Sequence, residues 1–239
     1  MEGKKCRCAA VVLAAGAGKR MHSEVKKQFL QIKEKPVVYY SLKVFEESFV
    51  DEVVLVTSGD DIELCRKEIV EAYHFTKVKN IVAGGKERYH SVAAGLACLQ
   101  EMDYVFIHDA ARPMLTQNIL DRAYECVKET GACVVGMPVK DTIKIANADG
   151  YINQTPDRNL VWMIQTPQVF EYQLIKEAYD RLIACEEELK SKGRNITDDA
   201  MVVESLTKHA VKLVEGSYEN IKITTPDDLS IAERFLENI

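Results

Sequence analysis

Short runs of apolar residues alternate along this chain with longer segments in which apolar residues recur every three or four positions. The first run, Cys8 to Ala14, is almost wholly apolar, and so are Val53 to Thr57 and Tyr104 to His108. Runs of this kind are typical of strands that are covered on both faces of a sheet, and the periodic segments are typical of helices. We expect strands at 8–14, 53–57, 80–83, 104–108, 132–139 and 211–214, and helices at 36–48, 62–73, 87–100, 117–129, 172–192 and 226–239, with a further helix starting near 197–199.

The alternation of strands and helices predicts an α/β fold, with a mostly parallel sheet and helices on both of its faces. No linker, repeat or shift in composition divides the chain, so we expect a single domain over residues 1–239. Ligands of such sheets bind beyond the carboxyl ends of the strands. The residues that follow each predicted strand are therefore the first candidates for chemistry.

The regular pattern breaks at about residues 140–163. Polar and apolar residues alternate from Thr142 to Ala146, and Asn147 to Gly150 form a turn signal. This pattern predicts a β-hairpin arm that projects from the sheet. A two-stranded hairpin alone is marginal in water, so the arm needs a surface to pack against. We favour a second copy of the chain as that surface, with packing onto its own domain as the alternative.

Composition excludes several classes of protein. A chain of 239 residues with 47% hydrophobic content has enough apolar side chains for a sizeable core and is not a disordered chain. The net charge of −6 argues against nucleic acid as a partner. No apolar run approaches the roughly 18 residues that a membrane span needs, so we expect no membrane partner.

The seven cysteines are scattered, without a C-x-x-C pair, and the first residues do not resemble a signal peptide. We therefore expect reduced thiols and a cytoplasmic location, with neither disulfides nor a zinc site.

The strongest chemical motif follows the first predicted strand, where residues 13–21 are L-A-A-G-A-G-K-R-M. Small residues allow a ligand to approach the backbone closely, and backbone N–H groups in such a loop bind phosphate oxygens. Lys19, Arg20, Lys26 and Lys27 add positive charge. Met21 replaces the third glycine of a dinucleotide fingerprint, and the P-loop spacing is absent. The alternative is an ordinary tight turn.

Two further motifs follow the third and fourth predicted strands. Gly84 and Gly85 precede Ser91, which suits a pocket lined by backbone, although a plain strand–turn–helix junction would also have this pattern. Asp109 and Arg112 lie in H-D-A-A-R-P, where the carboxylate suits Mg²⁺ or a sugar hydroxyl and the guanidinium suits a phosphate. A local ion pair between these two residues is the alternative. His108 is more simply explained as a packed histidine at the end of a strand.

The remaining motifs lie in the second half of the chain, at 157–159, 165–168, 196–200 and 220–224. The segment Thr197-Asp198-Asp199 is a helix cap, and a capped helix N-terminus is also an anion site. Lys222 lies between apolar neighbours on a predicted strand, where it either reaches the surface or faces a buried anion.

Taken together, eight motifs occur in order from Ala14 to Thr224: A-A-G-x-G-x-R-M, K-Q, G-G-x-x-R-x-x-S-V, H-D-A-A-R-P, D-R-N, T-P-Q-x-F, T-D-D-A and N-I-K-I-T. This set resembles the 2-C-methyl-D-erythritol 4-phosphate cytidylyltransferases of non-mevalonate isoprenoid synthesis. The resemblance implies a Rossmann-like nucleotidyltransferase fold and a homodimer in which each arm completes the partner's site. It also implies CTP and methylerythritol phosphate as substrates, with Mg²⁺ or another divalent cation as cofactor.

The resemblance also implies roles for individual residues. The nucleotide would be bound by Ala14, Ala15, Gly16, Gly18, Gly85, Ser91 and Asp109. The charge of the reacting groups would be stabilised by Arg20, Lys27, Arg158 and Lys222. The alcohol phosphate would be bound by Arg112, Thr142, Thr166 and Thr197. Asp109 would also bind the metal, and the partner subunit would supply Thr142 and Arg158. Lys86 stands where some relatives have an acidic residue.

The residue types suit this chemistry, because the attacking phosphate oxygen is already largely ionised near pH 7 and needs no general base. Three alternatives remain at this point. A ribitol 5-phosphate cytidylyltransferase shares the fold and most motifs, other sugar-nucleotide pyrophosphorylases share the fold, and a non-enzymatic nucleotide-binding regulator would use the same pocket.

Overall fold

The computed structural model describes residues 6–16, 21 and 25–237 of the chain. The strands of the main sheet are β1 (Cys8–Leu13), β4 (Glu52–Thr57), β5 (Val78–Ala83), β6 (Tyr104–Asp109), β7 (Ala132–Pro138), β10 (Trp162–Glu171) and β11 (Lys212–Glu215). The α-helices are α1 (Val37–Glu46), α2 (Ile62–Leu64), α3 (Arg88–Leu96), α4 (Gln117–Thr130), α5 (Tyr172–Ser191), α6 (Asp199–Leu206) and α7 (Pro226–Leu236). The shorter elements are β2 (Gln31–Ile32), β3 (Lys35–Pro36), β8 (Ile145–Ala146), β9 (Ile152–Gln154), the 3₁₀ turns η2 (Lys27–Phe29), η3 (Gly59–Asp61) and η5 (Arg158–Leu160), and the π-helix η4 (Cys65–Glu71).

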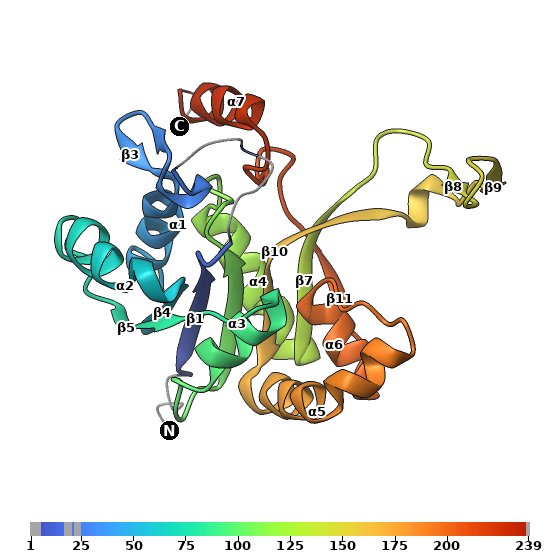
Figure 1. Ribbon diagram of the computed structural model, residues 1–239, viewed down its shortest axis with the longest axis horizontal. Helices are drawn as coiled ribbons and strands as arrows, with labels where there is room; N and C mark the ends of the chain where they lie inside the picture. Colours follow the sequence, from blue (N-terminus) through green and yellow to red (C-terminus); the bar gives the residue numbers. More distant parts are fainter. Residues whose placement is uncertain (1–5, 17–20, 22–24, 238–239) are drawn as a thin grey trace.

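The described residues form a central seven-stranded sheet with the order β11-β7-β10-β6-β1-β4-β5 (Figure 1). Neighbouring strands are parallel except around β10, which runs antiparallel to both β6 and β7. The sheet confirms the predicted α/β class. It also brings the carboxyl ends of β1 and β6, which are adjacent, to one edge.

Two hydrophobic layers cover the sheet, and β1 shows why. Ala10 and Val12 pack into one buried cluster with α1 and α4, whereas Ala9 and Val11 pack into the other with α3, α5 and α6. Successive side chains of a strand point to opposite faces, so a strand buried on both faces must be apolar throughout. The near-continuous apolar runs of the sequence therefore have the cause that was expected.

The pattern did not predict β10. Its residues Gln165, Thr166 and Gln168 are polar, yet all three are buried. Their side chains find partners, since Gln165 donates to the carbonyl of Ser217 and Gln168 donates to Asp198. The register of β10 against β7 shifts between Ile164 and Gln168, and this irregularity marks the polar part of the strand.

The predicted helix at 62–73 is confirmed from Ile62 to Glu71, but only its first turn, α2, is an α-helix, and the π-helix η4 follows. One local expectation was wrong. Lys222 does not lie on a strand, because residues 220–224 are irregular. The backbone there makes isolated contacts instead of a ladder, such as the hydrogen bond from the Ile223 amide to the carbonyl of Ala111 at 2.8 Å. The predicted start of the last helix is confirmed, with a Thr225 capping box and Pro226 in the first turn.

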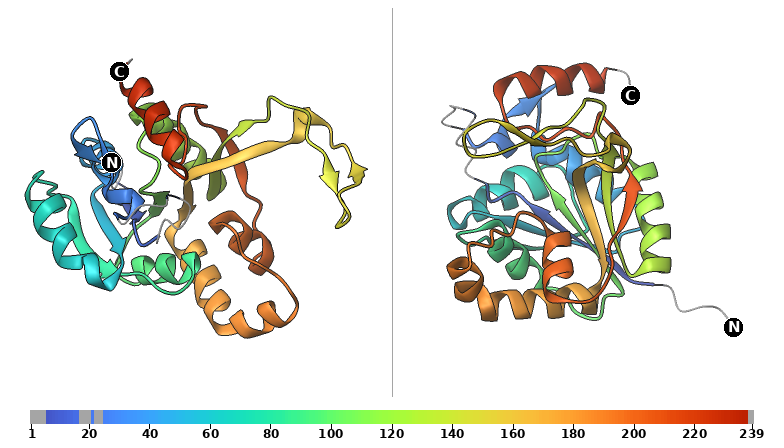
Figure 2. Two further views of the ribbon diagram at one scale, coloured as in Figure 1. Left: turned by 45° about the horizontal axis from the view of Figure 1, so that its top comes forward. Right: turned by 90° about the vertical axis from the view of Figure 1, so that its right-hand side faces the viewer.

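The arm projects from the sheet between β7 and β10, away from the body of the molecule (Figures 1 and 2). Its strands β8 and β9 pair antiparallel with each other. At the base of the arm, the Tyr218 hydroxyl donates to the carbonyl of Pro138, and the Lys140 ammonium lies 3.6 Å from the centre of the Tyr218 ring. The outer part exposes apolar side chains, with Tyr151 74% and Leu160 80% exposed.

Within the part of the chain that the structure describes, no helix is both long and apolar enough to span a bilayer.

Candidate functional site: two pockets that share one carboxylate

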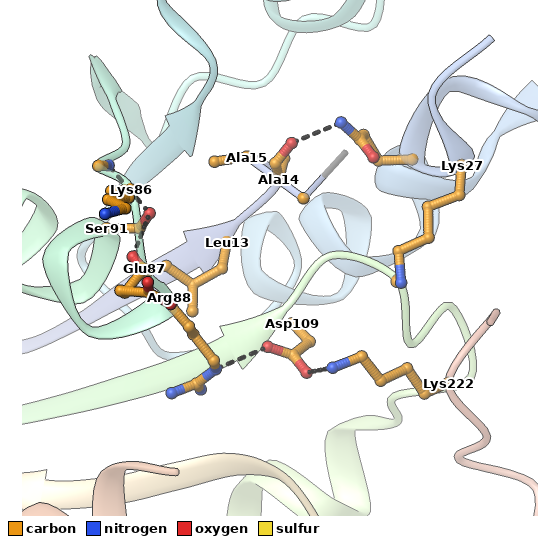
Figure 3. A pocket seen from close by; sticks show the side chains of 14 residues that line it. Leu13, Ala14, Ala15, Lys27, Lys86, Glu87, Arg88, Ser91, Asp109 and Lys222 are labelled. Atoms are coloured by element: carbon orange, nitrogen blue, oxygen red, sulfur yellow. Dashed lines mark hydrogen bonds and ion pairs between the residues drawn. The ribbon is translucent and has the colours of Figure 1, made fainter. Parts of the chain in front are cut away.

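A pocket of about 340 Å³ opens at the carboxyl ends of β1 and β6 (Figure 3). Its walls are the segment that follows β1, the loop between β5 and α3, the end of β6 and the segment before α7. The predicted residues at its wall are Ala14, Ala15, Gly16, Lys27, Gly85, Ser91, Asp109 and Lys222, with Lys86, Glu87 and Arg88 beside them. Gly18 and Arg20 lie outside the described residues.

The segment after β1 is held against its neighbours by backbone contacts. The Ala14 amide donates to the carbonyl of Val56 at 2.7 Å, and the buried Gln28 side chain donates to the carbonyl of Ala14 at 2.6 Å. The Lys27 ammonium donates to the carbonyl of Ile223 at 3.0 Å. Lys27 is thereby fixed beside the segment that carries Lys222, although the two are 195 positions apart in the sequence.

The loop between β5 and α3 has no room for side chains at its glycines. A Cβ at Gly84 would lie 2.6 Å from Ser91 Oγ and 2.7 Å from the Cβ of Ala15, distances that real Cβ atoms do not show. The Gly85 amide donates to Ser91 Oγ at 3.2 Å. The two loops therefore pack closely and leave backbone at the pocket wall, as the sequence predicted.

Asp109 is the electrostatic centre of the pocket. Lys222 Nζ lies 2.5 Å from Asp109 Oδ2, and Arg88 Nε lies 3.4 Å from Oδ1. Burial alone would raise the pKa of this carboxyl, but Arg88, and after it Lys222, hold that pKa far below its usual range. The alternative considered for this motif, an ion pair between Asp109 and Arg112, is not found, and Asp109 pairs with Arg88 and Lys222 instead.

A second pocket, of about 310 Å³, lies on the other side of Asp109. Arg112, Thr166 and Thr197 line it, as the sequence predicted for the alcohol phosphate, and Arg88, Asp109 and Lys222 line both pockets. One carboxylate and two cations therefore separate the two pockets.

Arg112 is suited to an anion in this second pocket. Its guanidinium donates to the carbonyl oxygens of Asn220 at 2.7 Å and Ile164 at 3.4 Å. No ion pair with a carboxylate is found for it within the described residues, and its buried Nε has no hydrogen-bond partner among them. A partly buried guanidinium of this kind is a ready partner for a phosphate.

Thr166 is joined to His108 in a chain of hydrogen bonds. His108 Nε2 lies 3.3 Å from the carbonyl of Arg112, which only accepts, so Nε2 carries the proton. Burial lowers the pKa of His108 to about 4, so the ring is neutral and its Nδ1 accepts from the Thr166 hydroxyl at 3.0 Å. The hydroxyl in turn accepts from the Asp109 amide at 3.1 Å. Thr166 thus fixes the backbone of Asp109, and His108 is a packed histidine as expected.

Two predicted residues do not reach either pocket of their own chain. Thr142 and Arg158 are exposed on the arm, and the Arg158 guanidinium donates to the carbonyl of Lys140 at 3.2 Å. Their predicted contribution to the partner's site stays a prediction.

Sequence reasoning overlooked the role of Arg88 and Asp199 in this site. Arg88 forms two hydrogen bonds with the buried Asp199, both of 2.7 Å. Both residues occur in quoted motifs, so the signal was present. What the sequence could not show is that residues 111 positions apart, at the starts of α3 and α6, pair with each other.

The donor set at Asp109 fits Mg²⁺ only in combination with a substrate. Among the described residues, no three His, Cys, Asp or Glu side chains are placed so that they could hold a metal ion together, so a site made by protein ligands alone is not found there. Mg²⁺ is commonly held by one or two carboxylates together with substrate phosphates. Asp109, at the wall of the first pocket, fits that arrangement.

Two cationic pockets on either side of a single carboxylate, at the carboxyl edge of a mostly parallel sheet, place the chain among the α/β nucleotidyltransferases. The sequence profile of the 2-C-methyl-D-erythritol 4-phosphate cytidylyltransferase family matches residues 8–238. The chain belongs to this family.

Relatives in the family are similar over nearly their whole length. The enzyme of this name from Lachnospira eligens is 55% identical over 95% of this chain and 98% of its own, and that from Lachnoclostridium phytofermentans is 50% identical over 95% of both chains. The crystal structure of 4-diphosphocytidyl-2C-methyl-D-erythritol synthase from Anaerococcus prevotii superimposes with a TM-score of 0.83, at 31% identity, over 97% of this chain and 96% of its own.

Proposed function

We propose that this chain transfers CMP from CTP to 2-C-methyl-D-erythritol 4-phosphate, giving 4-diphosphocytidyl-2-C-methyl-D-erythritol and pyrophosphate. The observation that carries the proposal is the carboxylate–cation group Asp109, Arg88 and Lys222, which lies between two pockets. A nucleotide in one pocket and an alcohol phosphate in the other would bring their phosphates together at this group.

The reaction needs positioning and neutralisation of charge. A phosphate oxygen of methylerythritol phosphate attacks the α-phosphorus of CTP in line with the bond to the β-phosphate. A P–O bond forms between the two substrates, the bond from the α-phosphorus to the bridging oxygen breaks, and that oxygen leaves with its electron pair as pyrophosphate. The attacking oxygen is already ionised near pH 7, so no proton has to be removed.

The nucleotide would occupy the first pocket. Backbone of the Ala14–Gly16 and Gly84–Gly85 segments would contact the base and phosphates at close range, as the small residues there allow. Lys27 would face the charge that grows at the α-phosphorus, because its ammonium already lies beside the Lys222 segment. Arg20 is proposed for the same role from the resemblance.

The alcohol phosphate would occupy the second pocket. Arg112 would supply positive charge for its phosphate. Thr197, an exposed residue just before α6, lines the same pocket. The Thr166 proton is committed to His108, so Thr166 would accept a hydrogen bond from a substrate hydroxyl and would not donate one to a phosphate. Lys222 borders both pockets and would hold the attacking phosphate near CTP.

A divalent cation, most simply Mg²⁺, would be held by Asp109 and the triphosphate. When bound, it neutralises charge on the phosphate oxygens.

The arm supports a homodimer as the active form. Its apolar residues Tyr151, Ile152 and Leu160 are 74%, 64% and 80% exposed, and burying such residues on a second copy stabilises the association. We propose that each arm carries Thr142 and Arg158 to the second pocket of the partner.

The seven cysteines are unpaired thiols in the structure, which supports a reducing compartment, and we propose the cytoplasm.

Isotope labelling tests the reaction directly. The protein is incubated with unlabelled CTP, Mg²⁺ and methylerythritol phosphate that carries ¹⁸O in its phosphate group. The masses of the CDP-alcohol and of pyrophosphate are then measured by mass spectrometry. The proposal expects all of the label in the CDP-alcohol and none in pyrophosphate. Label in pyrophosphate, or the absence of a CDP-alcohol, would refute it.

A further inference from the structure

Arg88 makes two kinds of contact from one guanidinium. Its Nη1 and Nη2 donate to the two oxygens of Asp199 at 2.7 Å each, and its Nε lies 3.4 Å from Asp109 Oδ1. The pairing with Asp199 is bidentate, which fixes the plane of the guanidinium as well as its distance. The weaker contact is the one that faces the two pockets.

Asp199 is itself fixed from three elements. Its side chain has no exposed surface, and the buried Tyr179 hydroxyl on α5 donates to its Oδ1 at 2.5 Å. The start of α6 is attached to β10, because the Ala200 amide donates to Gln168 Oε1 at 2.8 Å and Gln168 Nε2 donates to Asp198 Oδ2 at 3.1 Å. The side chain of Asp199 is therefore held in a single position by these contacts.

Lys222 differs from Arg88 in this respect. The two side chains are similarly exposed, Lys222 at 37% and Arg88 at 28%, but Arg88 also pairs with the buried Asp199, whereas the ion pair found for Lys222 among the described residues is with Asp109, and Lys222 comes from the irregular segment before α7. Of the two cations on Asp109, Arg88 is the fixed one, and Lys222 is the one that can turn to a phosphate.

A buried ion pair of this kind needs an explanation other than stability. The cost of removing two charges from water offsets most of the attraction between them, and apolar residues of similar size often stabilise a fold as well. The pair between Arg88 and Asp199 is linked to the site, however, because the same guanidinium also contacts Asp109, the carboxylate that lines both pockets.

We propose that Asp199, supported by Tyr179, is a positioning residue. It holds the Arg88 guanidinium 3.4 Å from Asp109, near enough to orient the carboxylate but too far to take up its oxygens in a short ion pair. This inference rests on the proposed function. If Asp199 loses its charge, Arg88 is released and turns onto Asp109, where it competes with the cation and with Lys222. The carboxylate is then less available to the bound nucleotide.

The test is a double-mutant cycle on the full chain, with kcat and KM measured for CTP and for methylerythritol phosphate. Asp199→Asn keeps the shape of the side chain, and we expect kcat/KM for CTP to fall ten- to a hundredfold, as is usual for residues that orient a ligand of a metal. In an Arg88→Gln background the same substitution should have no further effect, because Asp199 acts through Arg88.

Tyr179→Phe is the milder variant, and it keeps the ring that packs in the core. Loss of the one hydrogen bond should lower kcat/KM about fivefold, again only when Arg88 is present. This variant decides the matter if Asp199→Asn does not fold. Asp180→Asn is the matched control on α5, since Asp180 forms an exposed pair with Lys176 and should leave the kinetics unchanged.

Two results would overturn the inference. One is a folded Asp199→Asn protein, or Tyr179→Phe where the former does not fold, with kcat/KM within twofold of the unmodified chain. The other is an equal loss in the presence and absence of Arg88, which is what a merely structural role would give. Failure of the proposed function is distinguishable, because the unmodified chain would then release no pyrophosphate at all.

Discussion

Lys27 and Lys222 reach the same region from opposite ends of the chain. The Lys27 ammonium is fixed by the carbonyl of Ile223, the neighbour of Lys222, and Lys222 pairs with Asp109. Both lysines line the first pocket, so a triphosphate bound there would meet two ammonium groups.

Removal of Lys27 should therefore lower kcat. Lys27→Ala takes away one preorganised donor to the developing charge, and such losses amount to about 2.7–4 kcal/mol, or roughly a hundred- to a thousandfold in kcat. Steady-state kinetics with saturating CTP and methylerythritol phosphate measure the effect. Lys43→Ala, which removes an exposed lysine on α1, is the control. A loss of less than tenfold would exclude this role for Lys27.

His108 should make the fold less stable in mild acid. The pKa of this buried histidine is lowered from 6.5 to about 4. Between these two pH values the histidine is mostly protonated in the unfolded chain and mostly neutral in the folded chain, so protonation favours unfolding. The stability that the neutral ring contributes is present above pH 6.5 and is lost as the pH falls toward 4. Between about pH 7.5 and about pH 5 this amounts to about 2 kcal/mol.

Urea unfolding of the unmodified chain and of His108→Asn at several pH values measures this contribution. The amide oxygen of the variant can still accept from Thr166, but it does not titrate. The difference in stability between the two proteins should narrow by about 2 kcal/mol over that range. If the free energies of unfolding of the two proteins fall in parallel as the pH is lowered, His108 is not the cause of the loss of stability.

At the residue scale, the sequence predicted the wall of the site well. Residues that follow the buried strands β1 and β6 had to meet at one edge, because parallel neighbouring strands end together, and Asp109 and the segment after Leu13 do so. The pairing of Arg88 with Asp199 could not be predicted, because it depends on how α6 sits against β10. Arg20 lies outside the residues that the structure describes, so its role stays a prediction.

At the scale of elements, β10 is the instructive case. Its central residues are polar, so no hydrophobic pattern marked it, and it runs against the direction of its neighbours. The strand is stable because Gln165 and Gln168 find buried partners on other segments. These hydrogen bonds join segments that are distant in the sequence, so the local sequence does not reveal them. The helix predicted at 62–73 is present over 62–71, but its change to a π-helix after one turn was not predicted.

The arm is the element whose prediction is easiest to test. Leu160 is 80% exposed, so Leu160→Asp should not unfold a single chain. On the proposed dimer interface the new charge would be buried without a partner, and sedimentation should show a shift from dimer to monomer. Ile183→Asp on α5, a residue 41% exposed outside the arm, is the control. A variant that remains a dimer at the same concentrations would contradict an interface at Leu160.

At the scale of the whole molecule, the α/β class follows from the apolar strands, whereas the strand order and the projecting direction of the arm do not. The arm leaves the body between β7 and β10 (Figure 1). Thr142 and Arg158 are exposed on it and line neither pocket of their own chain. A complete site therefore requires a second chain in the proposed mechanism.

Mixed dimers test this requirement. Arg158→Ala would damage the site that receives the arm, and Lys27→Ala damages the pocket of its own chain. Neither variant alone should be active, but a mixture that exchanges subunits forms dimers in which one site is intact. With random exchange about a quarter of the activity should return. No recovery after verified exchange would contradict a shared site.

The central claim is that the two pockets around Asp109 join CTP to methylerythritol phosphate. The most direct measurement is pyrophosphate release from CTP and Mg²⁺ by the unmodified chain, with methylerythritol 4-phosphate and ribitol 5-phosphate in parallel reactions. We predict rapid release with methylerythritol phosphate and little with ribitol phosphate. Release with ribitol phosphate alone would keep the mechanism but overturn the substrate, and release with neither would contradict the account.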